Sequence, residues 1–86
     1  MYDVRLTPSA RDFFEAAPKN LQRRLDRCFD QLASDPRRHP NIKPLKGPFA
    51  GHLRYRVGDY RVVYSIDDKT GVVAVVLIAH RSGVYE

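Results

Sequence analysis

Residues 37–61 form a strongly basic segment whose side chains could bind phosphate. This stretch holds seven Lys and Arg residues against one acid, Asp59, which gives it a net charge of +6, while the whole chain carries +5. The seven are Arg37, Arg38, Lys43, Lys46, Arg54, Arg56 and Arg61. Charge concentrated in this way attracts polyanions, because it neutralises phosphates and releases their counterions. The alternative interpretation is a solvated charged face that contributes only solubility.

A second group of candidate side chains lies near the C-terminus. His80 and Arg81 follow a long apolar run, and Tyr85 comes four residues later. Because neighbouring residues of a strand point to opposite faces, only one of His80 and Arg81 can share a face with the basic residues. Tyr85 could stack on a nucleobase or pack as an apolar plug.

Composition narrows the class of protein. The 86 residues, 43 % of them hydrophobic, are enough for one small globular domain, which we expect to span residues 1–86. A single cysteine, Cys28, excludes an internal disulfide, and no metal-ligand spacing is found, so no metal or cofactor is predicted. No apolar run is long enough to cross a bilayer, and the N-terminus does not have the pattern of a secretory signal. We therefore expect a cytoplasmic protein with no membrane partner.

The first half of the chain predicts a strand and two helices. Residues 2–6 alternate between apolar and polar and predict a short strand, and Thr7-Pro8 is typical of a helix start. Pro18 separates this first helix from a second one, which should end near residues 34–36. The apolar stripe of the second helix consists of Leu21, Leu25, Cys28, Phe29 and Leu32. Its arginines Arg23, Arg24 and Arg27 predict a solvated surface, with a binding site as the alternative.

The second half predicts a loop and three strands. Residues 37–51 contain three prolines and two glycines, and we expect no regular structure there. Residues 52–57 and 60–66 alternate with a period of two on either side of Gly58-Asp59, which predicts a β-hairpin with a type II′ turn. Residues 72–79 are almost wholly apolar and predict a central strand. The expected fold class is α+β, in the order β-α-α-β-β-β, with a helical hairpin packed on one face of a mainly antiparallel four-stranded sheet.

The register of this hairpin gathers arginines on one face. With residues 58–59 in the turn, Arg56 faces Arg61, and alternation brings His52 and Arg54 to the same side. The other facing pairs are Arg54 with Val63 and His52 with Ser65. Two arginines directly opposite each other repel by up to about 1 kcal/mol, and an anion bound between them removes that repulsion. We therefore favour a phosphate site on this outward face over arginines that merely splay into water.

Several motifs resemble the RelE branch of the RelE/ParE bacterial toxins. They are Leu45-Lys46-Gly47, the run LRYRVGDYRVVY from Leu53 to Tyr64, His80-Arg81 and Val84-Tyr85. Proteins of this branch are the toxic halves of toxin–antitoxin pairs; they enter the ribosomal A site and cut mRNA there. The resemblance covers nearly the whole chain and implies a RelE-like domain with the same activity. It also implies the ribosome, mRNA and a cognate antitoxin as partners, with a toxin–antitoxin hetero-oligomer expected.

The resemblance assigns catalytic roles to three residues. Arg61 matches the arginine that stabilises the scissile phosphate, and Arg81 matches one that assists departure of the leaving oxygen. Tyr85 matches the tyrosine that stacks on or orients an mRNA base.

The chain departs from the family pattern at His52 and Arg54, which stand where RelE itself has two lysines, one of them a candidate base. Arginine stays protonated, so Arg54 can stabilise charge but is a poor proton acceptor. Histidine has a reference pKa of about 6.5, so His52 is a candidate general base. His80 is a second candidate, because some relatives use a histidine near this end of the chain.

The residue types suit RNA cleavage without a metal. RNA carries its own nucleophile, the 2′-hydroxyl, so the protein has only to align it, stabilise charge and move protons. The products would be a 2′,3′-cyclic phosphate and a 5′-hydroxyl. The remaining basic residues are predicted to bind RNA or rRNA phosphates: Lys43, Lys46, Arg56, Arg37 and Arg38. Two alternatives stay open, a ParE-type protein that inhibits DNA gyrase by binding and a non-catalytic nucleic-acid-binding module.

Overall fold

The computed structural model describes residues 1–81 of the chain. The elements are β1 (Asp3–Leu6), α1 (Pro8–Ala16), α2 (Lys19–Ser34), β2 (Ile42–Pro44), the 3₁₀ turn η1 (Gly47–Phe49), β3 (Leu53–Val57), β4 (Tyr60–Asp67) and β5 (Val72–His80). The strands form one sheet in the spatial order β1-β5-β4-β3-β2, and all neighbours are antiparallel except β1, which runs parallel to β5. The predicted α+β fold class is confirmed, with one strand more than expected.

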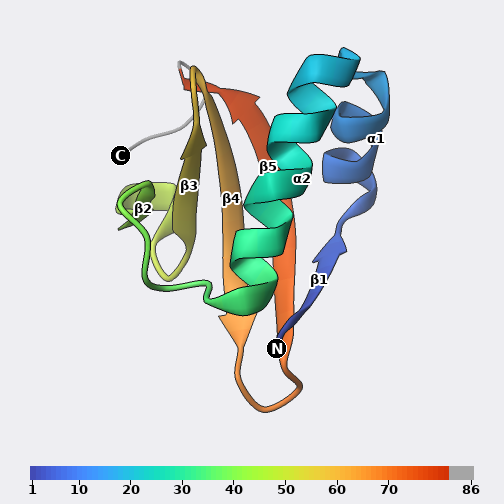
Figure 1. The fold of residues 1–86 in the computed structure, drawn as a ribbon. Coiled ribbons are helices and arrows are strands. Elements are labelled where there is room, and N and C mark those ends of the chain that lie inside the picture. Colours follow the sequence, from blue (N-terminus) through green and yellow to red (C-terminus); the bar gives the residue numbers. More distant parts are fainter. Residues whose placement is uncertain (82–86) are drawn as a thin grey trace.

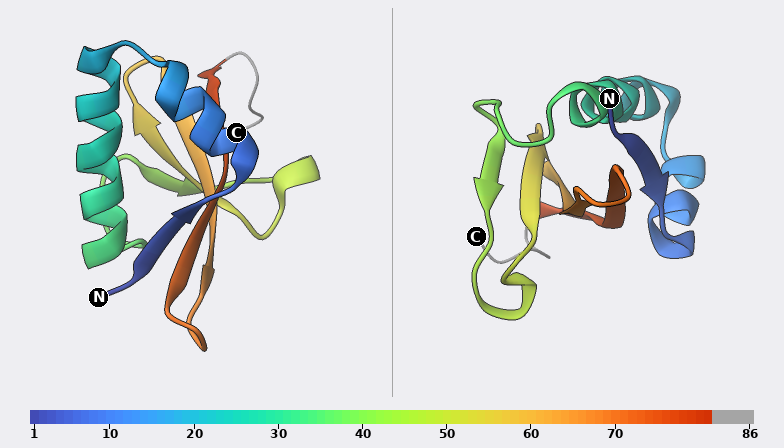
Figure 2. Two further views of the ribbon diagram at one scale, coloured as in Figure 1. Left: turned by 90° about the vertical axis from the view of Figure 1, so that its right-hand side faces the viewer. Right: turned by 90° about the horizontal axis from the view of Figure 1, so that it is seen from below.

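The helices and the loop around η1 lie on opposite sides of the sheet. Helix α2 crosses one face and contacts both β1 and β3, and α1 packs against β1 and β5 (Figure 1). In the left view of Figure 2, α2 stands on one side of the strands and the segment containing η1 extends from the other. The sheet therefore has one face covered by α2 and one face turned away from it.

Local signals start and end both helices where the sequence predicted. The hydroxyl of Thr7 accepts a hydrogen bond from the backbone N–H of Ala10, and Pro8 occupies the first turn of α1. Pro18 precedes α2, and α2 ends at Ser34. The side-chain amide of Gln22 donates to the carbonyl oxygen of Phe14 at 2.8 Å, which ties the second helix to the end of the first.

The hydrophobic core lies between the helices and the covered face of the sheet. The second helix contributes Leu21, Leu25, Cys28 and Leu32, and the sheet contributes Tyr55, Val57, Val62, Tyr64, Val73, Val75 and Ile78. The hydroxyl of fully buried Tyr64 donates to the carbonyl oxygen of Pro36 at 2.6 Å. Burial raises the pKa of the Cys28 thiol well above its usual range, so this cysteine is an unreactive core residue, as predicted.

One expectation for residues 37–51 is wrong: the segment contains strand β2 as well as η1. Prolines do not prevent β2, because it is an edge strand and Pro44 lies at its end, where no ladder hydrogen bond is lost. The backbone N–H of Leu45 then donates to the carbonyl oxygen of His52 at 3.0 Å and closes the loop around η1. Over residues 1–81, no helix is both long enough and apolar enough to span a membrane.

Candidate active site

The hairpin joins β3 to β4 through Gly58 and Asp59, in the predicted register. Its pairs include Arg56 with Arg61 and Arg54 with Val63. Gly58 has φ +58°, and within residues 1–81 only glycines have positive φ. A type I′ turn requires positive φ at both central positions, so the turn is consistent with type II′ and not with type I′. The predicted pairing of His52 with Ser65 is wrong, because β3 begins one residue later.

Strand β2 adds a second pair of like charges to the first. Lys43 is the direct cross-strand partner of Arg54, just as Arg56 is the partner of Arg61. The residues that alternate with them, among them Tyr55, belong to the helix-side core, so these four cations share the sheet face turned away from α2. Each pair of opposed like charges costs stability, by up to about 1 kcal/mol. We call these four residues the basic face.

Two members of the basic face are buried, contrary to the expectation of an outward, solvated surface. Arg54 is 4 % exposed and Arg61 is 9 % exposed, whereas Lys43 and Arg56 are exposed. This face also has buried apolar residues of its own, since Val63 and Leu45 are buried and neither belongs to the helix-side core. Alternation along a strand gives the face of a residue but not what covers that face.

Backbone carbonyls hold both buried guanidinium groups. An Nη1 of Arg61 donates to the carbonyl oxygens of Gly58 at 3.3 Å and Tyr60 at 3.2 Å, so the side chain folds over the hairpin turn. The Nη1 of Arg54 donates to the carbonyl oxygen of Asn41. A buried charge is tolerated only when it is hydrogen-bonded, and these contacts fix where the two positive charges lie.

Asn41 is a positioning residue that the sequence did not reveal. Its carbonyl oxygen also accepts from the backbone N–H of Arg56 at 3.0 Å, and its side-chain amide donates to the carbonyl oxygen of Arg56 at 3.0 Å. Its own N–H donates to Nδ1 of His39 at 3.1 Å. Asn41 therefore joins β2 to β3 beside Arg54, and no motif in the sequence could have shown this.

The two candidate bases fall on different sides of the sheet. His52 immediately precedes β3, and its ring meets the ring of Phe49 in η1 edge-on at 6.4 Å, in the segment on the side of the sheet away from α2; its Nδ1 is buried and has no hydrogen-bond partner among residues 1–81. His80 is the cross-strand partner of Tyr60 and meets its ring edge-on at 5.6 Å. Tyr60 packs against the helix-side core, so His80 is directed away from Arg61.

Arg81 lies close to the basic face, and Tyr85 falls outside the described residues. The backbone N–H of Arg81 donates to the carbonyl oxygen of Asp59 at 2.7 Å, which places the end of β5 beside the hairpin turn. The exposed Lys46 directly precedes η1.

The structure separates Arg37 and Arg38 from the basic face. Arg37 pairs with Asp68 at 2.8 Å, and Asp68 lies in the turn between β4 and β5, at the opposite end of β4 from the Gly58 turn. The backbone N–H of Arg38 donates to the carboxylate of Asp35 at the end of α2. Arg37 and Arg38 therefore lie apart from the basic face, since the loop that carries them leaves α2 at the far end of the sheet, and their binding of RNA or rRNA phosphates stays a prediction.

Comparison with known proteins identifies the family. Residues 4–85 match the sequence model of the ParE toxin of type II toxin–antitoxin systems. The toxin RelG of Mycobacterium tuberculosis is 35 % identical over 85 residues, which cover 98 % of this chain and 95 % of the relative. The chain belongs to the RelE/ParE toxin family. The toxin RelE of the same organism is also 35 % identical, over 98 % of this chain and 86 % of its own length.

Solved structures of this family share the fold of the toxin. The RelBE2 toxin–antitoxin complex of M. tuberculosis contains a chain with a TM-score of 0.77 and 32 % identity, covering 93 % of this chain and 98 % of its own. The archaeal RelE–RelB complex of Pyrococcus horikoshii gives a TM-score of 0.80 at 28 % identity, covering 93 % and 94 %. The chain is thus a RelE-type toxin of a type II toxin–antitoxin system.

Proposed function

We propose that this toxin is a ribosome-dependent mRNA endoribonuclease that cuts A-site codons. The observation that carries the proposal is the basic face, where Lys43–Arg54 and Arg56–Arg61 set like charges directly opposite each other. A sheet selected for stability alone gains nothing from such pairs. A phosphodiester gains from every one of them, because its charge rises as the 2′-oxygen attacks phosphorus.

In this proposal the four cations divide into exposed and buried roles. Lys43 and Arg56 are exposed and bind the RNA backbone first. Arg54 and Arg61 supply positive charge from surroundings of low dielectric, where charge interactions are stronger than in water. Direct contact of Arg61 with the scissile phosphate requires a rearrangement on RNA binding, since so little of this residue is accessible.

Proton transfer is assigned to His52 and assistance to the leaving 5′-oxygen to Arg81. His52 is the half-buried candidate base, and because its Nδ1 is buried, Nε2 is the nitrogen that would accept the proton of the 2′-hydroxyl. Tyr85 keeps its proposed role of orienting an mRNA base. The ribosome provides the remaining alignment by holding the mRNA rigidly in its A site.

The proposal also names the partners and the compartment. A cognate antitoxin protein would hold the toxin inactive in a hetero-oligomer, and the similar toxin chains of the RelBE2 and archaeal RelE–RelB structures are found in toxin–antitoxin complexes. The ribosome and mRNA place the activity in the cytoplasm.

One specific observation supports a second candidate: the matching family model is described as ParE, the toxin of the parDE system. A ParE-type toxin would inhibit DNA gyrase by binding. The curated relatives at 35 % identity are named RelG and RelE, which favours the nuclease.

Expression of the chain alone in bacteria separates these functions. The proposal expects rapid arrest of translation with new mRNA 5′ ends at defined positions within codons and intact chromosomal DNA. DNA double-strand breaks with intact mRNA would support gyrase inhibition, and growth arrest with neither lesion would leave only nucleic-acid binding.

A further inference from the structure

The structure contains a second cationic feature, a cleft of about 230 Å³ between α2 and the hairpin. It is lined by Arg24, Arg27, Cys28, Asn41, Tyr55, Arg56, Val57 and Gly58. Within residues 1–81, no acidic residue lines it. The cleft opens on the α2 side of β3, so it is distinct from the basic face.

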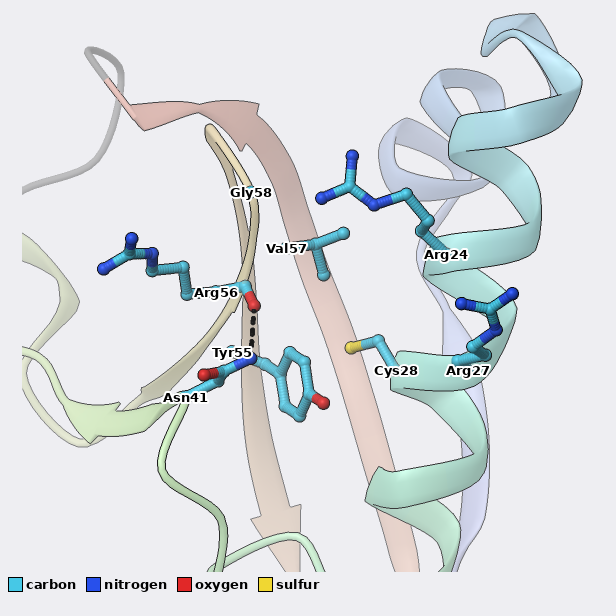
Figure 3. A pocket seen from close by; sticks show the side chains of 8 residues that line it. All are labelled: Arg24, Arg27, Cys28, Asn41, Tyr55, Arg56, Val57 and Gly58. Carbon is cyan, nitrogen blue, oxygen red and sulfur yellow. Dashed lines mark hydrogen bonds between the residues drawn. The ribbon is translucent and has the colours of Figure 1, made fainter.

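Arg24 and Arg27 form the charged wall of the cleft. They are three residues apart on α2 and therefore lie on the same side of the helix. Figure 3 shows the side chain of Arg24 reaching from α2 toward the hairpin. Its guanidinium lies so close to Gly58 that a Cβ atom there would come within 2.4 Å of an Nη.

Neither arginine of this wall is neutralised by the part of the chain that the structure describes. The ion pairs of residues 1–81 are Arg5–Asp3 and Arg37–Asp68, so Arg24 and Arg27 have no carboxylate of these residues within ion-pair distance. The opposite wall is β3, with the side chains of Tyr55 and Val57, and the carbonyl oxygen of Arg56 there is already bonded by the Asn41 amide (Figure 3). The unmet binding capacity of the cleft therefore belongs to the guanidinium groups, whose planar donors match phosphate oxygens.

The position of the cleft favours a long anion over a single ion. Arg56 belongs to both features: its backbone lines the cleft, while its side chain extends away from α2 toward the basic face (Figure 3). A chain of phosphates that leaves the basic face around the hairpin turn would meet Arg24 next. Only an extended polyanion can use both sets of charges at once.

We propose that the Arg24–Arg27 cleft binds a phosphodiester group of RNA next to the segment held by the basic face. This inference rests on the proposed function for the identity of the polyanion. Its effect is to add contacts on the side of the hairpin opposite to the chemistry, so that RNA wraps the turn and cannot slide along the basic face.

The test measures how binding depends on salt. A 2′-O-methyl oligoribonucleotide serves as the probe, because it binds without being cut by 2′-oxygen attack. For single strands each phosphate contact contributes about 0.7 to the slope of log K against log salt concentration. The double variant Arg24→Gln/Arg27→Gln should lower the slope by about 1.4, while Arg24→Lys/Arg27→Lys should keep the slope because it keeps the charge.

The matched control is Arg11→Gln/Lys19→Gln, which removes two exposed helix charges outside the cleft. Its slope should equal that of the native chain. Equal slopes for the native chain and the cleft double variant would overturn the proposal, as would an equal loss in the control. Loss of binding to a polyglutamate peptide with an unchanged RNA slope would assign the cleft to an acidic protein partner and also overturn it.

Cleavage of ribosome-bound mRNA by the native chain is measured separately. Absence of cleavage with the expected slopes would refute the nuclease function and leave the phosphate site standing. Normal cleavage by the native chain, with the same salt slope for the native chain and the cleft double variant, would support the nuclease function and refute the phosphate site in the cleft.

Discussion

Arg61 carries two tasks at once, and they can be measured apart. Its guanidinium is almost fully buried and satisfies the carbonyl oxygens of Gly58 and Tyr60, so it stabilises the hairpin as well as the charge of a bound phosphate. Its partner Arg56 faces it from β3 but is exposed. The pair thus offers two arginines of the same face in different surroundings.

Arg61→Ala should lower the free energy of unfolding by about 1–3 kcal/mol, because it removes the hydrogen bonds from a charged group to the carbonyl oxygens of Gly58 and Tyr60. It should also abolish growth arrest. The control Arg56→Ala should change stability by less than about 0.5 kcal/mol, as expected for an exposed residue. Urea denaturation monitored by circular dichroism measures both, and equal losses in the two variants would show that the burial of Arg61 has no energetic consequence.

The two histidines make opposite predictions for activity. His52→Ala should lower the cleavage rate by about 10²–10⁴-fold if His52 is the general base. His80→Ala should leave the rate within a few-fold, because His80 packs against Tyr60 on the helix side of the sheet. The measurement is single-turnover cleavage of ribosome-bound mRNA. Slow cleavage by His80→Ala together with fast cleavage by His52→Ala would identify His80, and not His52, as the general base.

The sequence showed the face of each arginine but not its surroundings. Period-two alternation around Gly58-Asp59 was sufficient to pair Arg56 with Arg61, since one turn fixes a register. Buried Arg54 donates to the carbonyl oxygen of Asn41, thirteen residues earlier, and this contact does not follow from a local pattern.

At the scale of the elements, the Gly58 turn connects the two cationic features. Gly58 needs its positive φ and also lies against Arg24. Gly71, in the β4–β5 turn, has a similar φ of +70° but lies beside open space, because no atom is within 4 Å of the place that a Cβ would take. Substitution of both glycines by alanine therefore introduces similar backbone strain, but only the substitution at Gly58 also crowds a side chain, that of Arg24.

Gly58→Ala and Gly71→Ala should each lower stability by about 1–2 kcal/mol, the cost of a left-handed conformation for an L-residue. Arg24 is flexible enough to move aside, so crowding should add little to stability. In Gly58→Ala, however, the added methyl group should displace Arg24 from the cleft and so lower the slope of log K against log salt concentration for RNA binding by about 0.7. Gly71→Ala should leave this slope unchanged. Equal salt slopes for Gly58→Ala and Gly71→Ala would show that Gly58 does not influence RNA binding in the cleft.

Strand β2 is the one strand that the sequence pattern did not predict. Three residues between prolines and glycines have too little alternation to predict a strand, and β2 forms only because β3 offers it a free edge. The helices and the long strands were predictable because their apolar periodicity extends over many residues. The missed strand matters for function, since it brings Lys43 opposite Arg54.

At the scale of the whole molecule, the arginines at the two ends of β4 lie in different surroundings. At the β4–β5 turn, the Asp68 carboxylate accepts from Arg37 at 2.8 Å and from the Tyr2 hydroxyl at 2.6 Å, which ties the N-terminus, the segment after α2 and the turn together. At the other end, around Gly58, Arg61 donates to the carbonyl oxygens of Gly58 and Tyr60, and Arg56 is exposed. Positive potential is therefore concentrated where the RNA is proposed to bind.

This clasp of Asp68, Arg37 and Tyr2 makes stability depend on pH in a defined direction. The hydrogen bond from Arg37 lowers the pKa of Asp68, so the clasp stabilises the fold above the unfolded-state value of about 3.9 and is lost as pH falls through the lower folded-state pKa. Asp68→Asn should therefore be less stable than the native chain at pH 7 and equally stable in strong acid. High salt should shrink the difference, because the groups are exposed.

Thermal unfolding at a series of pH values, with exposed Asp30→Asn as the control, measures the effect. A difference between Asp68→Asn and the native chain that persists unchanged in strong acid would show that the clasp does not act through the carboxylate charge.

The chemical identity of the cut ends tests the central claim most directly. Purified ribosomes carrying a defined mRNA are mixed with the toxin, and the products are analysed for their termini. Attack by the 2′-hydroxyl on the basic face predicts a 2′,3′-cyclic phosphate upstream and a 5′-hydroxyl downstream, with both absent for Arg61→Ala. Intact mRNA, or cuts that leave a 5′-phosphate and a 3′-hydroxyl, would contradict the account.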